Sequence, residues 1–360
     1  MIQVMSQPSK IRDSNLELFR CIVMLMIVAH HFVFHSGLMD LMSESQTSFK
    51  SLYLYLFGAW GKVGINCFVL ITGYFMCKSN ITIRKFLKLL FQIEFYKIAI
   101  YLIFAFAGYE SFSFANFLES ISPIVYISDD FVSCFLLFYL FIPFLNVIVR
   151  NVNRRQHGLL ILLCLSIFSV LPLVPYVEIS SNYIVWFCVL FFISSYIRLY
   201  NVESICKCWG MLSILSVIVA VFSILFFISQ GMRWPYYLVY DSNKLLALAV
   251  SISSFLFFKN IKMRYSRIIN AIGSTTFGIL LIHDCGWTMR TWLWQDVINP
   301  KFWYTGNVYL YSIASVCCVF AICSFLDIVR QYLFEKPLFQ LLDLYLGNCQ
   351  CLKNVDLKWN

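Results

Sequence analysis

Hydrophobic residues run along this chain in long blocks that are separated by short polar stretches. Ten blocks are long enough to cross roughly 30 Å of hydrocarbon, which takes about 20 residues of α-helix. They lie near residues 16–36, 57–77, 87–108, 131–149, 158–176, 182–200, 208–229, 243–258, 271–289 and 307–330. The pattern predicts an all-α, polytopic membrane protein with about ten transmembrane helices.

Composition and charge support this prediction. The chain is 61% hydrophobic and 12% charged, whereas a soluble domain is about half apolar and about a quarter charged. The net charge of +9 could suggest a nucleic-acid partner. With the N-terminus placed in the cytoplasm, however, 20 of the 27 Lys and Arg fall on the cytoplasmic side and 6 on the other. This positive-inside distribution predicts two cytoplasmic termini, a lipid bilayer around the chain and no nucleic acid.

The blocks show no internal repeat and no second domain. We expect a cytoplasmic N-terminal lead over residues 1–15, a single transmembrane domain over 16–336 and a cytoplasmic tail over 337–360. Charged residues precede the first apolar run and no small-residue cleavage site follows it, so we expect no removable signal peptide. The start of the tail is expected to lie along the membrane surface.

The first block carries ionisable side chains, which are costly in lipid and therefore point to function. It contains Glu17, Arg20, His30, His31 and, at its end, His35. At about 100° and 1.5 Å per helical residue, Arg20 and His31 share a face to within about 20° and lie roughly 16 Å apart, while His30 is turned about 80° away. The spacing selects His31 as the functional candidate and His30 as structural. Simple topology anchoring by Arg20 and ordinary interhelical hydrogen bonding by His31 are the alternatives.

A basic cluster follows the second block. Arg84 and Lys88 are four residues apart, so they point the same way on a helix, and Lys85 lies between them. The cluster is either ordinary positive-inside charge or a clamp for a phosphorylated ligand in the cytoplasm. The block before it is rich in small residues that let helices approach closely: Gly58, Gly61, Gly64 and Gly73.

Further along, the ninth block contains His283 next to Asp284. An acid beside an imidazole can tune or orient it, and ordinary packing is the alternative. Metal binding has little support, because the chain has only five histidines and its 14 cysteines lack paired CxxC spacing. We therefore expect no metal site.

Several of these stretches, in order, resemble one family of membrane proteins. Glu17, Arg20 and His31 match the opening signature of the acyltransferase-3 family, which acylates surface carbohydrates. FVLITGYFM resembles its F-x-x-SGY segment, with Thr72 where Ser is usual, and RKFLK resembles its R-R-x-x-R cluster. FLLFYLFIPFLN, GILLIH and FEKPL resemble its helix with P-x-LN, its YLIH stretch and its closing E-[KR]-P.

The resemblance implies an O-acyltransferase of the bacterial cytoplasmic (inner) membrane. It implies acyl transfer, with acetyl expected first, from cytoplasmic acyl-CoA to a hydroxyl of an envelope or surface polysaccharide: O-antigen, capsule or a lipid-linked glycan precursor. His31 would act as general base or transient acyl carrier, with Glu17 and His283 as further catalytic residues. The phosphates of CoA would meet a basic group: Arg20, Arg84, Lys85 and Lys88. The glycan would face loop acids and aromatic residues: Glu110, Glu119, Asp129, Asp130, Trp234, Tyr236 and Tyr237.

Two other classes of function compete with this interpretation. A transporter or flippase for lipid-linked saccharides commonly has Gly- and Pro-interrupted helices and repeated halves. The low counts of Gly (14) and Pro (8) and the absence of a visible repeat disfavour it. A non-enzymatic scaffold would not need Arg20 and His31 on one helix face. The acyltransferase is the prediction and the transporter is its alternative.

Overall fold

A computed structural model describes residues 13–346, apart from 80, 125–129, 175–176, 178, 180–181 and 203–207. The described residues are 79% helical and contain no strand. Most of the predicted N-terminal lead, the tail beyond residue 346 and Asp129 lie outside the described residues.

Within the described part, eight helices or helix pairs are long and apolar enough to cross a membrane. They are α1 (Ser14–Phe34), α3 (Phe49–Gly58) with α4 (Gly61–Met76), α5 (Ile83–Phe106), α7 (Phe131–Asn151), α8 (Arg154–Leu165) with its extension to Leu173, α9 (Tyr183–Tyr200), α10 (Trp209–Ser229), and α16 (Val308–Arg330) with α17 (Lys336–Leu346). The chain is thus a polytopic, all-α membrane protein, as predicted.

The two remaining apolar blocks take less regular forms. The eighth is α11 (Leu245–Asn260), which is only 16 residues long. The ninth is a bent pair, formed by α12 (Arg267–Gly273) with α13 (Thr276–His283) and by α14 (Gly286–Thr291) with α15 (Pro300–Tyr304). Two short helices complete the described α-helices: α2 (Leu38–Glu44) and α6 (Phe114–Ser120).

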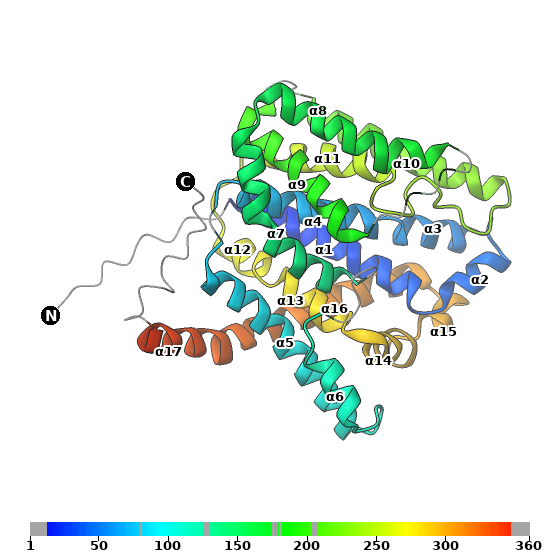
Figure 1. Cartoon of the computed structure of the whole chain (residues 1–360). Helices are drawn as coiled ribbons and strands as arrows, with labels where there is room; N and C mark the ends of the chain where they lie inside the picture. Colours follow the sequence, from blue (N-terminus) through cyan, green and yellow to red (C-terminus); the bar gives the residue numbers. More distant parts are fainter. Residues whose placement is uncertain are drawn as a thin grey trace.

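Helix α1 lies at the centre of the bundle, surrounded by α3, α4, α11, α12, α13 and α16 (Figure 1). Glycines allow α4 to approach it. A Cβ added at Gly64 would lie 2.8 Å from Cγ1 of Ile27, and one added at Gly61 would collide with the ring of His30. The close approach predicted from these glycines is therefore present. It packs α4 tightly against α1 at Ile27 and His30.

The ninth block is not the continuous span that its hydrophobicity predicts. Helix α13 ends at His283, α14 begins at Gly286, and the two halves are bent by 100°. Gly286 has φ 74°, a left-handed conformation that glycine adopts without steric cost. The apolar character continues through the corner, so the hydrophobic pattern does not reveal the break. The corner places His283 and Asp284 beside the end of α1.

Candidate active site

A histidine pair links the ends of α1 and α13. His31 Nδ1 lies 2.9 Å from His283 Nε2, although the two residues are 252 positions apart in the chain. His283 Nδ1 lies 2.6 Å from the carbonyl oxygen of Ile279, one turn earlier in α13. The His283 ring is fully buried, and the His31 side chain is 13% exposed. The structure thus brings together two of the three residues predicted to be catalytic.

These contacts assign the protons of the pair. The Ile279 carbonyl can only accept, so His283 Nδ1 carries the hydrogen of that bond. In the neutral ring, His283 Nε2 is then an acceptor and His31 Nδ1 donates to it. The lone pair of neutral His31 is consequently on Nε2. That arrangement suits a general base or a nucleophile.

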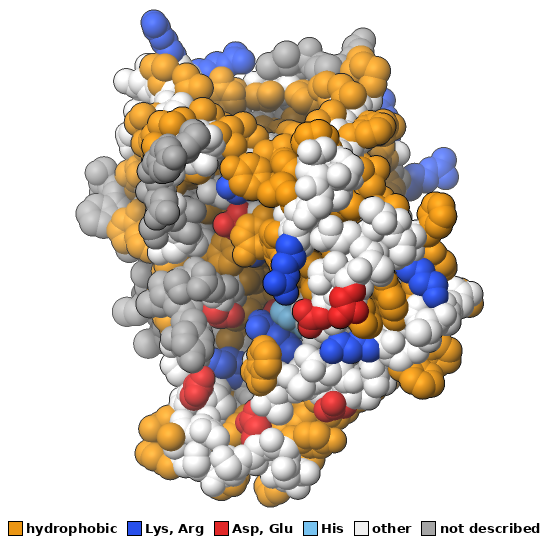
Figure 2. Space-filling view, turned by 90° about the vertical axis from the view of Figure 1, so that its right-hand side faces the viewer, with side chains coloured by type: hydrophobic (Ala, Val, Ile, Leu, Met, Phe, Trp, Pro, Cys, Tyr) orange, Lys and Arg blue, Asp and Glu red, His pale blue; other side chains and the backbone are white. Residues whose placement is uncertain are grey.

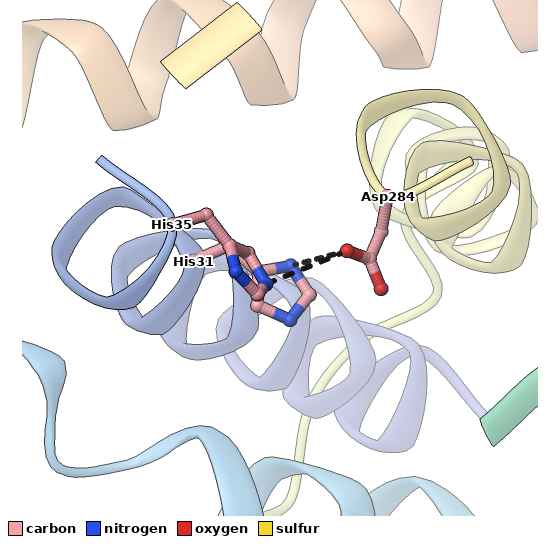
Figure 3. A group of neighbouring side chains, drawn as sticks. All are labelled: His31, His35 and Asp284. Carbon is pink, nitrogen blue, oxygen red and sulfur yellow. Dashed lines mark ion pairs between the residues drawn. The ribbon is translucent and has the colours of Figure 1, made fainter. Parts of the chain in front are cut away.

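A carboxylate stands beside the pair at the helix break. Asp284 Oδ1 lies 3.7 Å from His31 Nδ1 and 3.7 Å from His35 Nε2, and both rings point toward it from α1 (Figure 3). Arg290 holds this carboxylate: its Nε is 2.5 Å from Oδ1 and its Nη2 is 3.1 Å from Oδ2. At 3.7 Å the imidazoles are not hydrogen-bonded to Asp284. The carboxylate instead supplies a fixed negative charge.

The three residues His31, His35 and Asp284 could be considered as ligands for a metal ion, because their ligand atoms lie within 4.8 Å of one another. The surroundings do not fit that use. His31 Nδ1 already faces His283, and the cationic Arg290 binds both oxygens of Asp284. A cation bound through His31 Nδ1 and Asp284 would have to displace both partners.

At the other end of α1, Glu17 and Arg20 form an ion pair. Arg20 Nη1 lies 3.1 Å from Glu17 Oε1 and 3.5 Å from Oε2, and Glu17 is only 3% exposed because Gly273 of α12 packs on it. Glu17 precedes His31 by 14 residues, or about 21 Å of helix. It therefore does not touch the histidine pair. In this structure its position serves to orient Arg20.

His30, which helix geometry turns away from this face, has a packing role. Its Nδ1 lies 2.7 Å from the Gly58 carbonyl, and its ring fills the space left by Gly61. Its ring also stacks on Phe34 at 4.0 Å between centroids. These contacts tie α1 to α3 and α4.

The predicted basic cluster lines a cavity of about 460 Å³ between the start of α5 and α17. The lining residues are Arg84, Lys85, Lys88, Glu335, Lys336, Phe339 and Gln340. Arg84 and Lys88, both more than half exposed, pair with Asp343 at 2.7 Å and with Glu335 at 2.6 Å. Lys336 is a fourth cation that sequence reasoning did not place here, because only the fold brings α17 against α5. We call this the basic cavity.

A buried ionic network lies next to the basic cavity and shares Glu335 with it. Arg330, 2% exposed, reaches Asp327 at 2.8 Å and Glu335 at 2.6 Å. Tyr96 donates to Asp327 at 2.8 Å. Each charge therefore has a partner, as buried ions require. The network joins the π-helical turn Gln331–Glu335 to α5 and fixes the position of Glu335 beside Lys88.

A second cavity, of about 580 Å³, lies at the break between α13 and α14. Its walls come from the second half of α5, from residues 109–123 around α6, from the start of α7 and from residues 280–288. Asp284 belongs to both this cavity and the histidine cluster. Figure 2 views the molecule from this end and shows acidic, basic and histidine side chains gathered in a hollow. We call it the acidic cavity.

The acidic cavity contains only part of the surface expected to face a glycan. Three of the loop acids line it: Glu110, Glu119 and Asp130. Tyr236 does not: it is 2% exposed and donates to the Tyr55 carbonyl at 3.0 Å. Trp234 packs against Phe34, 5.8 Å between ring centroids, outside this cavity.

Comparison with known proteins agrees with the resemblance found in the motifs. The family model described as an acyltransferase domain, that of the acyltransferase-3 family, matches residues 13–326. No curated protein and no solved structure shows a significant match. The matched region contains α1, the histidine pair, Asp284 and the cluster of Arg84, Lys85 and Lys88. The chain therefore belongs to the acyltransferase-3 family and is a multi-pass membrane acyltransferase.

Proposed function

We propose that the protein transfers an acyl group, acetyl in the first instance, from cytoplasmic acyl-CoA to a saccharide hydroxyl on the opposite side of a bacterial inner membrane. The acceptor belongs to an envelope or surface polysaccharide: O-antigen, capsule or a lipid-linked precursor. One observation carries the proposal. Two cavities of opposite charge occupy the two ends of α5, and the acidic one adjoins the histidine pair.

The separation of the cavities suits transfer across a bilayer. On α5 the basic cavity extends to Lys88, and the acidic cavity begins at Lys97 and reaches Phe104. The nine to sixteen helical steps from Lys88 rise about 14–24 Å, a large part of the roughly 30 Å of a hydrocarbon core. If the basic cavity opens to the cytoplasm, as the positive-inside distribution predicts, the acidic cavity opens to the other side.

The basic cavity suits the phosphates of CoA. Arginine and lysine are the usual partners of phosphate oxygens. Arg84 and Lys88 are held by Asp343 and Glu335 in this structure, and phosphates would compete with these carboxylates. Arg20 is proposed as a further contact of the donor, oriented by Glu17. The extended pantetheine arm would carry the thioester toward His31.

The histidine pair supplies the chemistry. His31 Nε2 takes the proton of the acceptor hydroxyl, and the hydroxyl oxygen forms a C–O bond to the carbonyl carbon of the thioester. The C–S bond breaks, and CoA leaves as the thiol after receiving that proton. Asp284, 3.7 Å from His31 Nδ1, compensates the transient positive charge of the imidazolium. The same Nε2 lone pair could instead carry the acyl group in a covalent intermediate, so both routes use His31.

The experiment is acyl transfer in membranes that contain the protein, labelled acetyl-CoA and the native envelope glycan. His31→Ala should abolish labelling of the glycan, while His30→Ala, its neighbour on the other face, should retain it apart from losses due to folding. Full labelling by His31→Ala would remove His31 from the reaction. Rapid acid quenching of the wild type then separates the two routes, because only a covalent intermediate leaves label on the protein.

The transporter alternative has one observation in its favour. The break between α13 and α14 is a discontinuous helix, and such helices form the central sites of many transporters. Translocation of a lipid-linked saccharide that persists in CoA-depleted vesicles would establish that alternative. Translocation or modification that requires acyl-CoA supports the transferase.

A further inference from the structure

The walls of the acidic cavity carry more negative than positive charge. Among the described residues, Glu110, Glu119 and Asp130 line it together with a single cation, Lys97. Its fourth carboxylate, Asp284, is paired with Arg290 and is left out of this count. Three carboxylates and one ammonium remain, an excess of two negative charges. An anionic ligand in this cavity would therefore meet like charges at close range.

The same walls offer the groups that bind uncharged sugars. Ionised carboxylates only accept hydrogen bonds, so they match the hydroxyls or ammonium groups of a ligand. Tyr109 and Trp287 supply aromatic faces, on which the C–H faces of a sugar ring can pack. Trp287 is 75% exposed and Tyr109 is 57% exposed, so both rings are accessible. Polar groups beside aromatic walls occur in small-molecule sites.

Size and position agree with an acceptor site. The volume of about 580 Å³ lies within the range of roughly 300–1,000 Å³ that ligand pockets show. Asp284 lines the cavity and stands 3.7 Å from His31 Nδ1, so the cavity lies within one side chain of the candidate base. A sugar bound there would lie beside Asp284 and next to the histidine pair.

We propose that the acidic cavity binds the acceptor and selects saccharides that are neutral or carry an amino group over those that carry carboxylates or phosphates. This inference rests on the proposed function. The two cavities then sort the two substrates by charge: the basic cavity, with Arg84, Lys85 and Lys88, attracts the anionic donor, and the acidic cavity excludes it. Like-charge contacts are an effective means of rejecting a wrong ligand.

The first experiment measures competition. Membranes containing the full chain transfer label from acetyl-CoA to the native glycan in the presence of one of three trisaccharides: a neutral glucose trimer, a glucosamine trimer or a galacturonic acid trimer. The neutral and amino trimers should compete. The acidic trimer should need at least roughly a hundredfold higher concentration, which corresponds to about 2.7 kcal/mol. Equal competition by the acidic trimer, or no competition by any of them, would overturn the proposal.

Variants locate the effect in the cavity. Glu119→Gln should raise the KM for the acceptor about tenfold, and Glu119→Lys should let the acidic trimer compete. Glu44→Gln is the matched control, because Glu44 is exposed on α2 and does not line the cavity. A Glu119→Lys enzyme that still rejects the acidic trimer would contradict the electrostatic argument.

The aromatic contribution has its own control. Trp287→Ala should raise the acceptor KM about tenfold and leave the KM for acetyl-CoA unchanged. Trp303→Ala is the control: it tests whether the rise in acceptor KM comes only from the loss of a tryptophan that anchors the protein at the membrane interface. Trp303 is 42% exposed and lies outside the cavity. Equal effects of the two variants would remove Trp287 from the acceptor site.

Failure of the inference is distinguishable from failure of the proposed function. Release of CoA from acetyl-CoA, dependent on His31 and Arg84, reports the donor half of the reaction. If that activity is present but the acidic trimer competes equally, only the acceptor proposal fails. If no CoA is released under any condition, the proposed function fails.

Discussion

Replacing His283 should slow acyl transfer without weakening donor binding. His283 Nε2 accepts the hydrogen of His31 Nδ1 at 2.9 Å, and its own Nδ1 is fixed by the Ile279 carbonyl. In His283→Leu the buried Nδ1–H of His31 loses its acceptor, which costs about 1–3 kcal/mol. The other tautomer of His31, with its hydrogen on Nε2, also becomes accessible. Nε2 then cannot take a proton.

The magnitude follows from that cost. If the free energy of the lost hydrogen bond adds in full to the activation free energy of transfer, about 1–3 kcal/mol corresponds to a fall of roughly 5- to 150-fold in kcat. The KM for acetyl-CoA should not change, because the basic cavity lies at the other end of α5. His283→Gln provides the matched variant: its amide oxygen can accept the same hydrogen, so it should recover part of the lost rate.

The assay is steady-state transfer of labelled acetyl groups, with thermal unfolding of each purified variant measured in parallel. The reasoning predicts a kcat effect, an unchanged donor KM and partial recovery by glutamine. It would be refuted by a folded His283→Leu enzyme of wild-type kcat. Equal loss in the leucine and glutamine variants would also refute it, because orientation by a hydrogen bond could then not be the cause.

Three further changes test neighbouring parts of the site. Arg290→Met should lower kcat about tenfold, since Asp284 loses the two hydrogen bonds that Arg290 donates, and a wild-type kcat would show that anchoring of Asp284 by Arg290 is not needed for catalysis. Asp343→Asn should lower the KM for acetyl-CoA by up to about fivefold, because an exposed ion pair with Arg84 is worth about 0.2–1 kcal/mol; a raised KM would show that Asp343 assists binding. Gly286→Ala should destabilise the protein by about 1–2 kcal/mol, because φ is 74° there, and an unchanged unfolding temperature would contradict that strain.

Much of the fold could be predicted from hydrophobic block length alone. Each predicted block corresponds to a long helix, to the shorter α11 or to the bent pair at residues 267–304. The break in that pair could not be predicted, because residues 271–289 stay apolar through the corner. The bend depends on the left-handed conformation of Gly286 and on packing against other helices, neither of which is visible in a hydrophobic pattern.

The candidate site was also predictable only in part. Helical arithmetic within α1 separated His31 from His30, because the relation depends on local geometry that is the same in every helix. The partner of His31 is 252 residues away, and its pairing is set by the fold. Arg290 and Arg330 were not singled out from the sequence. Arg330 follows Asp327 by three residues on α16, a local spacing that could have indicated their pairing. Asp284 lies across the helix break from Arg290, and Glu335 ends the π-helical turn after Arg330, so these partners become apparent only in the structure.

Transfer across a sealed membrane tests the central claim most directly. Purified protein is reconstituted into vesicles, labelled acetyl-CoA is supplied only on the side of Arg84 and Lys88, and the native glycan only on the side of the acidic cavity. The account predicts that wild-type protein labels the glycan and that folded His31→Ala protein does not. Equal labelling by the two proteins would contradict it.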